Sequence, residues 1–383
     1  MTKRGASVDR SFRGEIVRYI KDPISTTEHC RYSLMCRHVC PVGNITHSET
    51  LTPHGWALVV ASVKRGLLAW DEESVDILYK CADCGLCQSH CGTNQPLPTA
   101  IAAARAEVVE QGLAPPQVLA IDKALQKWAN PYAKRAPRKV KAKGVIGLYV
   151  GDAAEYLYPS TLEAALKLLE AISVNPVLVG VGCSNGFLAS SLGLAATATR
   201  LAKVILGEVV KADCGKLLVL SPGDLYAFRT LYTERLNLTW PLEVEVVEAT
   251  SFLYNAFKSG KLSLNVQGAA PSYAYHDPCH SPRVRRDHEA PRQLLSAVLG
   301  TSPVELFWRE QRAHPCGAVG GLELTQPELA TQLAEARFAD THRAGASLLI
   351  TEDPLCLNQL KKHASFGIEV KGLYETLVEG INE

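Results

Sequence analysis

The 383-residue sequence has no uninterrupted apolar run of the roughly 18 residues that a membrane helix needs, and its N-terminus has no apolar core of signal-peptide length. We therefore expect a cytoplasmic protein without a transmembrane segment, which reaches the inner face of a membrane only through a partner. The sequence also lacks an excess of charge of one sign, because its formal net charge is +1. Nucleic acid and acidic membrane surfaces are therefore not expected as partners.

A motif of cofactor chemistry is missing as well. No Gly-x-Gly-x-x-Gly fingerprint follows a strand-like segment. Nothing therefore indicates a flavin or nicotinamide bound by this chain, and we expect a partner to carry out hydride chemistry. Apolar residues at 47% and charged residues at 21% are typical of a globular protein, and the length predicts two or three domains.

Cysteine, in contrast, is abundant, with 12 residues. Disulfides explain them poorly in a reducing compartment, so clustered cysteines favour metal ligation or catalysis. Two cysteine-rich runs between Cys30 and Cys91 are separated by residues 51–80, whose helical apolar spacing predicts two short helices that bring the runs together. A further helix is expected from Pro98 to Gln111, with Gly112 as its stop.

From residue 145 onward, short apolar runs alternate with helical patterns, which predicts a mainly parallel sheet with helices packed on it. The expected strands are VIGLYVG, VLVGVG, KLLVLS and EVEVVEA, and then SYAYHD, PVELFW, SLLITED and GIEVKG. The two series suggest an internal duplication. Three pairs of landmarks keep offsets of 127, 133 and 132 residues between the halves: Asp152 with Cys279, Cys183 with Cys316, and Asp224 with Cys356.

The run CADCGLCQSHC has a cysteine spacing that is typical of iron–sulfur clusters. Three thiolates on such a tight loop bind three irons of a cubane, while a structural zinc site prefers two separated Cys-x-x-Cys pairs. In two-cluster ferredoxins the fourth cysteine of each run ligates the other run's cluster. We therefore expect a [4Fe–4S] cluster at the set that we call site A: Cys40, Cys81, Cys84 and Cys87.

The run HCRYSLMCRHVCP nearly repeats this pattern, but Ser33 stands where a cysteine is expected. Crossed ligation then leaves three thiolates for a second cluster, and we call this set site B: Cys30, Cys36 and Cys91. Three thiolates suit a [3Fe–4S] cluster. The spacing Cys-x5-Cys-x3-Cys-Pro resembles the three-iron run in the iron–sulfur subunit of succinate dehydrogenases and fumarate reductases.

Two alternatives remain open for the cluster position that faces Ser33, where a fourth ligand would bind. One is a [4Fe–4S] cluster with the Ser33 oxygen as its fourth ligand, and the other is a [4Fe–4S] cluster with an imidazole ligand from His29 or His38. Loss of an iron and a thiolate generally raises the reduction potential, because the potential follows cluster charge, hydrogen bonding and burial. A [3Fe–4S] cluster would therefore favour a high-potential acceptor.

The second half of the chain resembles a known family. YHDPCHSPR (275–283) and PCGAVGGLEL (315–324) are similar to the cysteine-rich CCG domain of heterodisulfide reductase catalytic subunits, which also occurs in iron–sulfur subunits of glycolate oxidase and anaerobic glycerol-3-phosphate dehydrogenase. In that family a two-cluster ferredoxin-like module precedes two CCG repeats. This order matches nearly the whole chain, and the basic segment 128–144, which contains two prolines and no apolar period, marks the expected domain boundary. We therefore expect an α+β protein with four parts: a helical ferredoxin-like module (1–127), a basic linker (128–144), a degenerate first α/β repeat (145–260) and a second α/β repeat (261–383).

The resemblance implies less about the chemistry of the repeats. Each family repeat presents a cysteine after its first strand, a Cys-Cys pair and a Cys-x-x-Cys, which together hold a non-cubane [4Fe–4S] cluster. One of these five positions is cysteine in the first repeat, which shows Asp152, Cys183–Ser184, Ser221 and Asp224. Three are cysteine in the second repeat, which shows Cys279, Pro315–Cys316, Asp353 and Cys356. The double non-cubane site is therefore not expected, and heterodisulfide cleavage is not carried over.

Two interpretations of the remaining cysteines stay open. In the first, they hold a single metal centre whose candidate ligands are Cys279, Cys316 and Cys356, joined by Cys183 or by a histidine among His276, His280 and His314. In the second, they are ordinary small buried residues of a repeat that has lost its cluster.

Two functions follow from these observations. The first is an iron–sulfur electron-transfer subunit of a multi-subunit oxidoreductase, which passes electrons between a flavoprotein dehydrogenase partner and a quinone or another carrier. It would transfer electrons rather than convert a substrate itself. The second is a terminal reductase with a catalytic metal or cluster at Cys279, Cys316 and Cys356.

Overall fold

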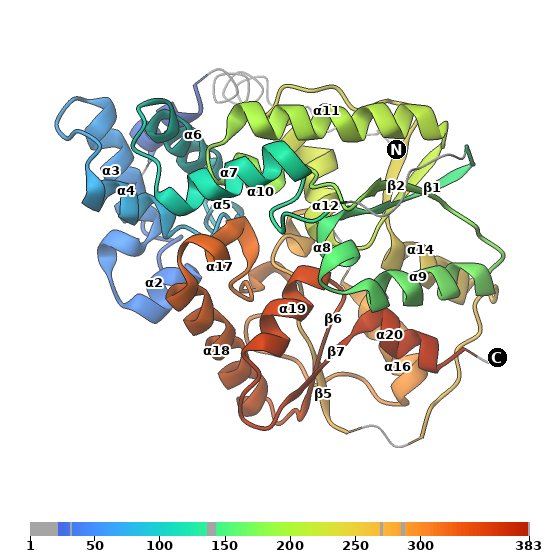
Figure 1. The fold of residues 1–383 in the computed structure, drawn as a ribbon. Helices are drawn as coiled ribbons and strands as arrows, with labels where there is room; N and C mark the ends of the chain where they lie inside the picture. The colour runs from blue at the N-terminus through green and yellow to red at the C-terminus, as the bar shows by residue number, and fades with distance from the viewer. Residues whose placement is uncertain (1–21, 31–32, 136–142, 269–270, 285–287, 382–383) are drawn as a thin grey trace, which may run out of the picture.

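The computed structural model describes residues 22–30, 33–135, 143–268, 271–284 and 288–381. Helices dominate, and two parallel sheets complete the fold, which confirms the expected α+β class. Figure 1 shows the helices of the N-terminal third gathered on one side of the molecule and the two sheets on the other. None of the helices in the described ranges is both long and apolar enough to cross a membrane.

The N-terminal part is built from short helices. They are η1 (Pro23–His29), α2 (Pro41–Thr46), η2 (Glu49–Leu51), α3 (Pro53–Lys64), α4 (Glu72–Tyr79), α5 (Leu86–Ser89), α6 (Leu97–Glu110) and α7 (Pro116–Trp128). The Thr52 hydroxyl caps α3 by accepting from the Gly55 amide, and the Asp71 carboxylate caps α4 by accepting from the Ser74 amide. The two helices expected between the cysteine runs are thus confirmed as α3 and α4, and the next expected helix as α6.

The first sheet has the order β2-β1-β3-β4, and all its strands are parallel. The strands are β1 (Ile146–Val150), β2 (Val177–Val181), β3 (Lys216–Val219) and β4 (Glu245–Glu248), which confirms the four expected in this half. Its helices are α8 (Gly151–Tyr156), α9 (Pro159–Ala171), α10 (Phe187–Ser191), α11 (Ala195–Ala212), α12 (Pro222–Tyr226), η3 (Ala227–Leu231), α13 (Tyr232–Glu234) and α14 (Ala249–Lys258). The strands are nearly continuous apolar runs because helices cover both faces of the sheet.

The second sheet has the order β5-β6-β7 and is also parallel. Its strands are β5 (Tyr273–Tyr275), β6 (Leu348–Thr351) and β7 (Glu369–Gly372). Its helices are α15 (Ser281–Val284), α16 (Glu289–Leu299), η4 (Glu310–Arg312), η5 (Val319–Gly321), α17 (Leu322–Thr325), α18 (Pro327–Arg343), α19 (Pro354–Lys362) and α20 (Leu373–Glu379).

The strand expected at PVELFW does not form. Only an isolated bridge pairs Val304 with Ala274, and at the end of this segment the backbone amides of Phe307 and Trp308 donate to the Asp340 carboxylate. This bridge lies beside β5 as β2 lies beside β1. Both halves therefore share one strand order, as expected for repeats.

The parts of the chain pack against one another through shared cores. One core joins Leu78 and Ala104 of the N-terminal helices to Leu192 and Leu201 of the first half, all fully buried. A second core lies between the two sheets and contains residues of both. The domain boundaries given above remain predictions, and residues 136–142 of the expected linker lie outside the described residues.

Candidate metal centres

The four thiols of site A lie at the start of α2 (Cys40), just after α4 (Cys81), in the loop before α5 (Cys84) and within α5 (Cys87). Cys40 is the N-cap of α2, and its sulfur accepts from the Gly43 amide at 3.4 Å. The sulfur of Cys81, just after α4, accepts from the Asp83 amide at 3.5 Å. Gly85, with φ of 73°, reverses the chain so that α5 begins directly after it. Two sulfurs thus already accept backbone N–H groups, as thiolate ligands of clusters do.

The site A thiols are close enough to affect one another electrostatically. Burial, reinforced by the neighbouring Cys84 and Cys81, raises the pKa of Cys40. Burial, followed by the thiols of Cys84, Cys81 and Cys40, raises the pKa of Cys87 well above its ordinary value. Four protein thiols in so little space are costly as free thiolates and favourable as ligands of a cationic iron core. The donor set therefore fits a [4Fe–4S] cluster.

The three thiols of site B line a cavity of about 350 Å³, which Cys87 of site A also borders. Burial raises the pKa of Cys36 to about 11, and Cys30 and Cys91 add to the rise. All three are partly exposed, whereas three of the four site A cysteines are buried and only Cys87 is partly exposed. Site B is thus the more solvent-accessible of the two.

The cavity of site B also indicates which side chain could be the fourth ligand of a cluster there. Ser33 lines it together with the three thiols, while neither His29 nor His38 belongs to its lining. The His29 ring lies 2.8 Å from the Ser25 carbonyl, and the His38 ring packs edge-on against His90. Among the three residues proposed for this position, the geometry favours Ser33 over either imidazole.

A buried ion pair fixes the loop of site A, and the sequence pattern gave no sign of it. Asp83, between Cys81 and Cys84, binds the Arg235 guanidinium through both carboxylate oxygens at 2.7 and 2.8 Å and accepts from the Ser191 hydroxyl at 2.5 Å. Burial alone would raise the pKa of Asp83, but Arg235 outweighs it and holds this pKa below its ordinary value. The loop is thereby attached to the first repeat.

The second repeat contacts site A from the other side. Arg283 Nε donates to the Cys84 carbonyl at 3.2 Å, and His314 Nε2 lies 3.1 Å from the carbonyl of Val39, which precedes Cys40. A Cβ at Gly320 would lie only 2.8 Å from the Ala82 carbonyl oxygen, so the two backbones touch. Site A therefore lies between the N-terminal helices and the second repeat.

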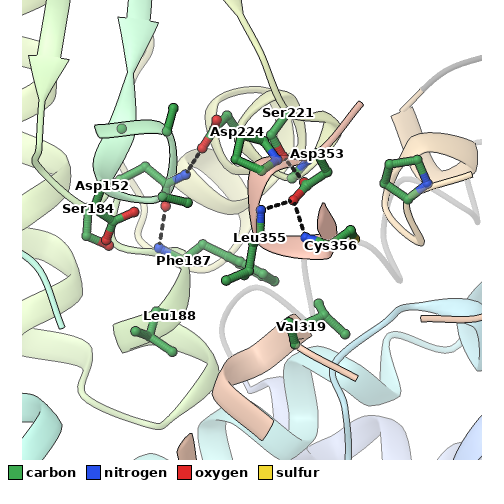
Figure 2. Close-up of a pocket in the computed structure, with 18 of the residues that line it drawn as sticks. Asp152, Ser184, Phe187, Leu188, Ser221, Asp224, Val319, Asp353, Leu355 and Cys356 are labelled. Carbon is green, nitrogen blue, oxygen red and sulfur yellow. Dashed lines mark hydrogen bonds between the residues drawn. The ribbon is translucent and has the colours of Figure 1, made fainter. Parts of the chain in front are cut away.

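A cavity of about 120 Å³ lies where the carboxyl ends of both sheets' strands meet, and we call it the C-terminal cavity. Ligands commonly bind at such ends of parallel strands. Figure 2 shows residues of both repeats facing one another across it. Most of the CCG-motif positions named above line it: Asp152, Ser184, Ser221, Asp224, Cys279, Cys316, Asp353 and Cys356. Cys183 and Pro315 do not belong to the lining, although Cys183 was a candidate ligand.

The first repeat lines this cavity with carboxylate and hydroxyl side chains in place of thiols. Burial raises the pKa of Asp152 to about 6, and burial together with Asp353 and Asp152 raises that of Asp224 well above its ordinary value. Asp224 accepts from the Asn185 amide at 2.6 Å, and Asp353 accepts from the Ser221 hydroxyl and from the Cys356 amide at 3.0 Å. These groups do not reproduce the five-cysteine set of a family repeat, so the double non-cubane site does not fit.

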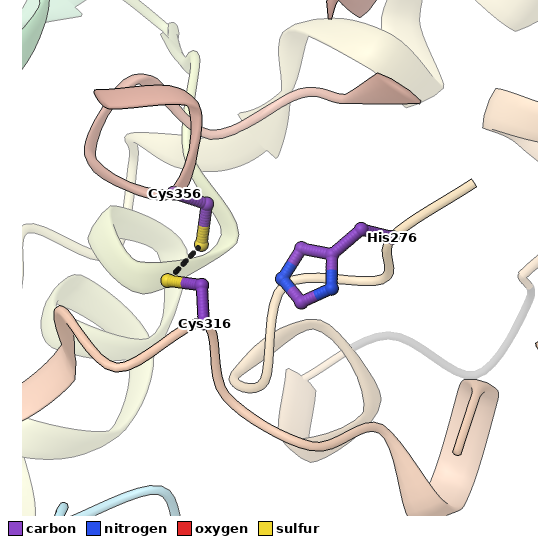
Figure 3. Close-up of side chains that lie close together, drawn as sticks. All are labelled: His276, Cys316 and Cys356. Atoms are coloured by element: carbon purple, nitrogen blue, oxygen red, sulfur yellow. Dashed lines mark hydrogen bonds between the residues drawn. The ribbon is translucent and has the colours of Figure 1, made fainter. Parts of the chain in front are cut away.

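Three side chains at the edge of this cavity form a compact donor set, which we call the His276 group: His276, Cys316 and Cys356. Their ligand atoms all lie within 4.8 Å of one another, and the two sulfurs are 3.1 Å apart. Figure 3 shows the His276 ring facing both thiols. His276 Nε2 is buried with no hydrogen-bond partner among the described residues, which a metal ion would satisfy.

The spacing of these sulfurs favours one ion over a cluster. In a tetrahedral site with metal–sulfur bonds of about 2.3 Å, two sulfurs lie roughly 3.8 Å apart, whereas ligands of different irons in a cluster lie farther apart. Burial lowers the pKa of His276 to about 3, so the imidazole is neutral and able to bind a metal. Cys279 is outside this group, and its sulfur lies 3.8 Å from His280 Nδ1.

Comparisons with known proteins agree with this architecture. Residues 273–361 match the family of the cysteine-rich domain CCG. The chain is 25% identical over 303 residues to one of the subunits of dihydromethanophenazine:CoB–CoM heterodisulfide reductase from Methanosarcina barkeri, a match that covers 76% of this chain and 73% of that protein. It is 26% identical over 216 residues to lactate utilization protein A of Shouchella clausii, which covers 55% of this chain and 88% of the relative.

A solved structure shares the fold. The crystal structure of a hypothetical protein from Helicobacter pylori matches with a TM-score of 0.61 and 13% sequence identity, over 97% of this chain and 76% of that one. At this identity the likeness concerns the fold alone.

Proposed function

Because this chain carries a CCG cysteine-rich domain and is homologous to heterodisulfide reductase-like iron–sulfur oxidoreductase subunits, we propose that it is the electron-transfer subunit of a multi-subunit oxidoreductase. It would pass electrons between a flavoprotein dehydrogenase partner and a quinone or another carrier. The observation that supports this most directly is the separation of seven cysteines into a largely buried site A and a solvent-accessible site B.

Each site has a defined set of proposed ligands. Site A would hold a [4Fe–4S] cluster, and site B would hold a [3Fe–4S] cluster or a [4Fe–4S] cluster completed by Ser33. When bound, both clusters would supply one-electron transfer. The protein itself positions the thiols, limits water at site A and exposes site B to a partner.

The accessibility of site B supports a partner at that end of the molecule. Leu34 and Met35 border its cavity and are 42% and 51% exposed. Electron exchange between proteins requires a cluster near the surface, and apolar side chains around it favour docking. We therefore place a redox partner at site B, in a complex that associates with a membrane only through its other subunits.

Low-temperature electron paramagnetic resonance with an iron count tests the two clusters. A signal in the oxidised protein that disappears on reduction, with about seven irons per chain, indicates a [3Fe–4S] plus a [4Fe–4S] cluster. Two variants distinguish the roles of Ser33. If site B holds three irons, Ser33→Ala leaves the signal unchanged and Ser33→Cys converts it to that of a reduced cubane.

If Ser33 is instead a ligand of a cubane, the oxidised wild-type protein gives no paramagnetic resonance signal. The Ser33→Ala variant then contains less iron than the wild type. Cys214→Ala, at a buried cysteine outside both sites, is the matched control. Absence of cluster signals and iron from the anaerobically purified wild type overturns the proposed function.

Co-purification from the native source identifies the partner, and a protein that acts on a substrate alone contradicts the subunit role.

The His276 group favours a second candidate function, a terminal reductase with a catalytic metal ion at the C-terminal cavity. Three protein ligands leave a fourth position open toward the cavity, as in catalytic metal sites. Site A lies against the same repeat and would supply electrons there.

Metal analysis of the whole chain tests this candidate. One ion per chain beyond the cluster iron is expected, lost in His276→Ala and Cys316→Ala and kept in Cys183→Ala, which removes a buried thiol outside the group. Turnover that disappears with that ion while the cluster signals persist supports the terminal reductase. Equal metal content in the wild type and all three variants contradicts it.

A further inference from the structure

Within the described ranges, Arg283 is a cation without an anionic partner at the junction between site A and the C-terminal cavity. Its Nε donates to the Cys84 carbonyl at 3.2 Å and its Nη1 to the Gln311 carbonyl at 3.4 Å. Its Nη2 is buried and has no partner among the described residues. A buried charge is costly unless something of opposite sign compensates it.

The surroundings of Arg283 show which groups could compensate its positive charge. A Cβ at Gly85 would lie 3.4 Å from Arg283 Nε, so the guanidinium lies directly against the cysteine loop. Burial lowers the pKa of Arg283, whereas the thiols of Cys84, Cys279 and Cys87 favour its charged form. Two of these thiols belong to site A and the third lines the C-terminal cavity.

A second arginine, Arg105, also donates to a backbone carbonyl of the cysteine loop. Arg105 is 1% exposed and donates only to backbone carbonyls, at 2.7 Å to Cys81 and Ser191 and at 2.8 Å to Leu78. In the part of the chain that the structure describes, no carboxylate forms an ion pair with Arg105 or Arg283. Asp83 is not free to do so, because Arg235 already neutralises it.

Site A thus lies beside two positive charges that no described carboxylate compensates. A cubane with four thiolate ligands has a net negative charge, which becomes more negative by one unit when the cluster accepts an electron. Positive charges held nearby therefore stabilise both the bound cluster and, more strongly, its reduced form.

We propose that Arg283 is a positioning residue that serves, with Arg105, as the counter-charge of the cluster at site A and raises its reduction potential. This inference rests on the proposed function, because it requires a cluster at site A. Arg283 also lies beside Cys279, so the charge gained at site A on reduction is felt at the edge of the C-terminal cavity.

A redox titration of the whole chain, followed by electron paramagnetic resonance with dithionite as the electron donor, tests the proposal. Arg283→Met removes the charge at similar length, Arg283→Gln keeps a donor for the Cys84 carbonyl, and Arg283→Lys keeps the charge. In both neutral variants we expect the equilibrium constant for reduction of the site A cluster to fall by about tenfold, which is about 59 mV for one electron. Arg283→Lys should stay near the wild-type potential.

The control is Arg229→Met, because Arg229 is an exposed arginine that also donates to a backbone carbonyl, that of Val246. It should leave the potential unchanged. Neutral variants that lose the cluster while Arg283→Lys retains it also support the counter-charge.

An unchanged potential in the neutral variants, or an equal change in Arg283→Lys, overturns this inference and leaves the proposed function intact. Loss of the cluster in Arg283→Lys as well as in the neutral variants overturns it too. A wild type without any cluster at site A overturns the proposed function, and this inference with it.

Discussion

At the scale of single residues, the position between two site A cysteines has a larger structural role than its place in the motif suggests. Asp83 adopts a left-handed backbone conformation, with φ of 50°, and binds Arg235 with both oxygens. The side chains of the pair are 4% and 5% exposed. Removing one partner of a buried pair leaves the other charge without compensation, which is strongly destabilising.

We therefore predict that Asp83→Asn lowers the free energy of unfolding by about 3 kcal/mol at neutral pH. Asp213→Asn, which breaks the exposed pair with Lys143, should change it by less than about 0.5 kcal/mol. Urea denaturation measures both. Equal effects of the two substitutions would show that the buried pair does not hold the loop.

The same pair predicts a pH dependence. Because Arg235 holds the pKa of Asp83 below its ordinary value, the pair's contribution is complete above the ordinary carboxyl pKa of about 3.9 and is lost as the pH falls through the lower folded value. The difference in melting temperature between wild type and Asp83→Asn should therefore be constant from about pH 7 to about pH 5 and shrink below about pH 4. A difference that grows on acidification contradicts the assignment.

At the scale of elements, the short helix η5 positions the second repeat against the cysteine loop. Gly320 within it has φ of 70°, and a Cβ there would lie 2.8 Å from the Ala82 carbonyl oxygen. Gly367 has φ of 68°, but a Cβ there would meet nothing within 4 Å. The two glycines thus differ in surroundings and not in backbone conformation.

Alanine substitutions at these two glycines therefore separate the cost of backbone strain from the cost of a steric clash with the cysteine loop. Gly367→Ala should cost about 1–2 kcal/mol from backbone strain alone. Gly320→Ala should cost more and also lower the iron content of site A, since it pushes Ala82 and the loop away from the repeat. Denaturant midpoints and iron analysis check both. Similar losses of stability and full iron content in both variants would argue against direct contact.

At the scale of the whole molecule, site A ties three parts of the chain together. The Asp83–Arg235 pair joins it to the first repeat, and Arg283 and His314 join it to the second. Iron removal should therefore weaken all three parts, because ligands that bind only the folded state stabilise it as a unit.

Anaerobic removal of iron with a chelator tests this coupling. We expect a lower melting temperature and faster amide hydrogen exchange in the N-terminal helices and also in residues 314–321 of the second repeat. Exchange that rises only within residues 22–128 would show that the N-terminal helices respond alone.

Local sequence patterns were enough to locate several helices, most strands and the two cysteine runs. Apolar periodicity located α3, α4 and α6 and seven of the eight expected strands, because buried strands and amphipathic helices carry their period in the chain. The strand expected at PVELFW does not form. There the amides of Phe307 and Trp308 donate to the Asp340 carboxylate, 32 residues downstream of Trp308, a contact that no local pattern encodes. Cysteine spacing likewise predicted three ligands of site A and two of site B, because these lie close together in the chain, while Cys40 and Cys91 were assigned by analogy with two-cluster ferredoxins.

Which side chains from distant parts of the chain lie together became clear only from the tertiary structure. It brought His276 to Cys316 and Cys356 while leaving Cys183 and Cys279 outside that group, and it placed Ser33 rather than His29 or His38 on the cavity of site B. The two arginines beside site A have no sequence signature, because the groups they bind there are backbone carbonyls of distant parts of the chain. Such long-range contacts depend on how the sheets and helices pack, which no local pattern encodes.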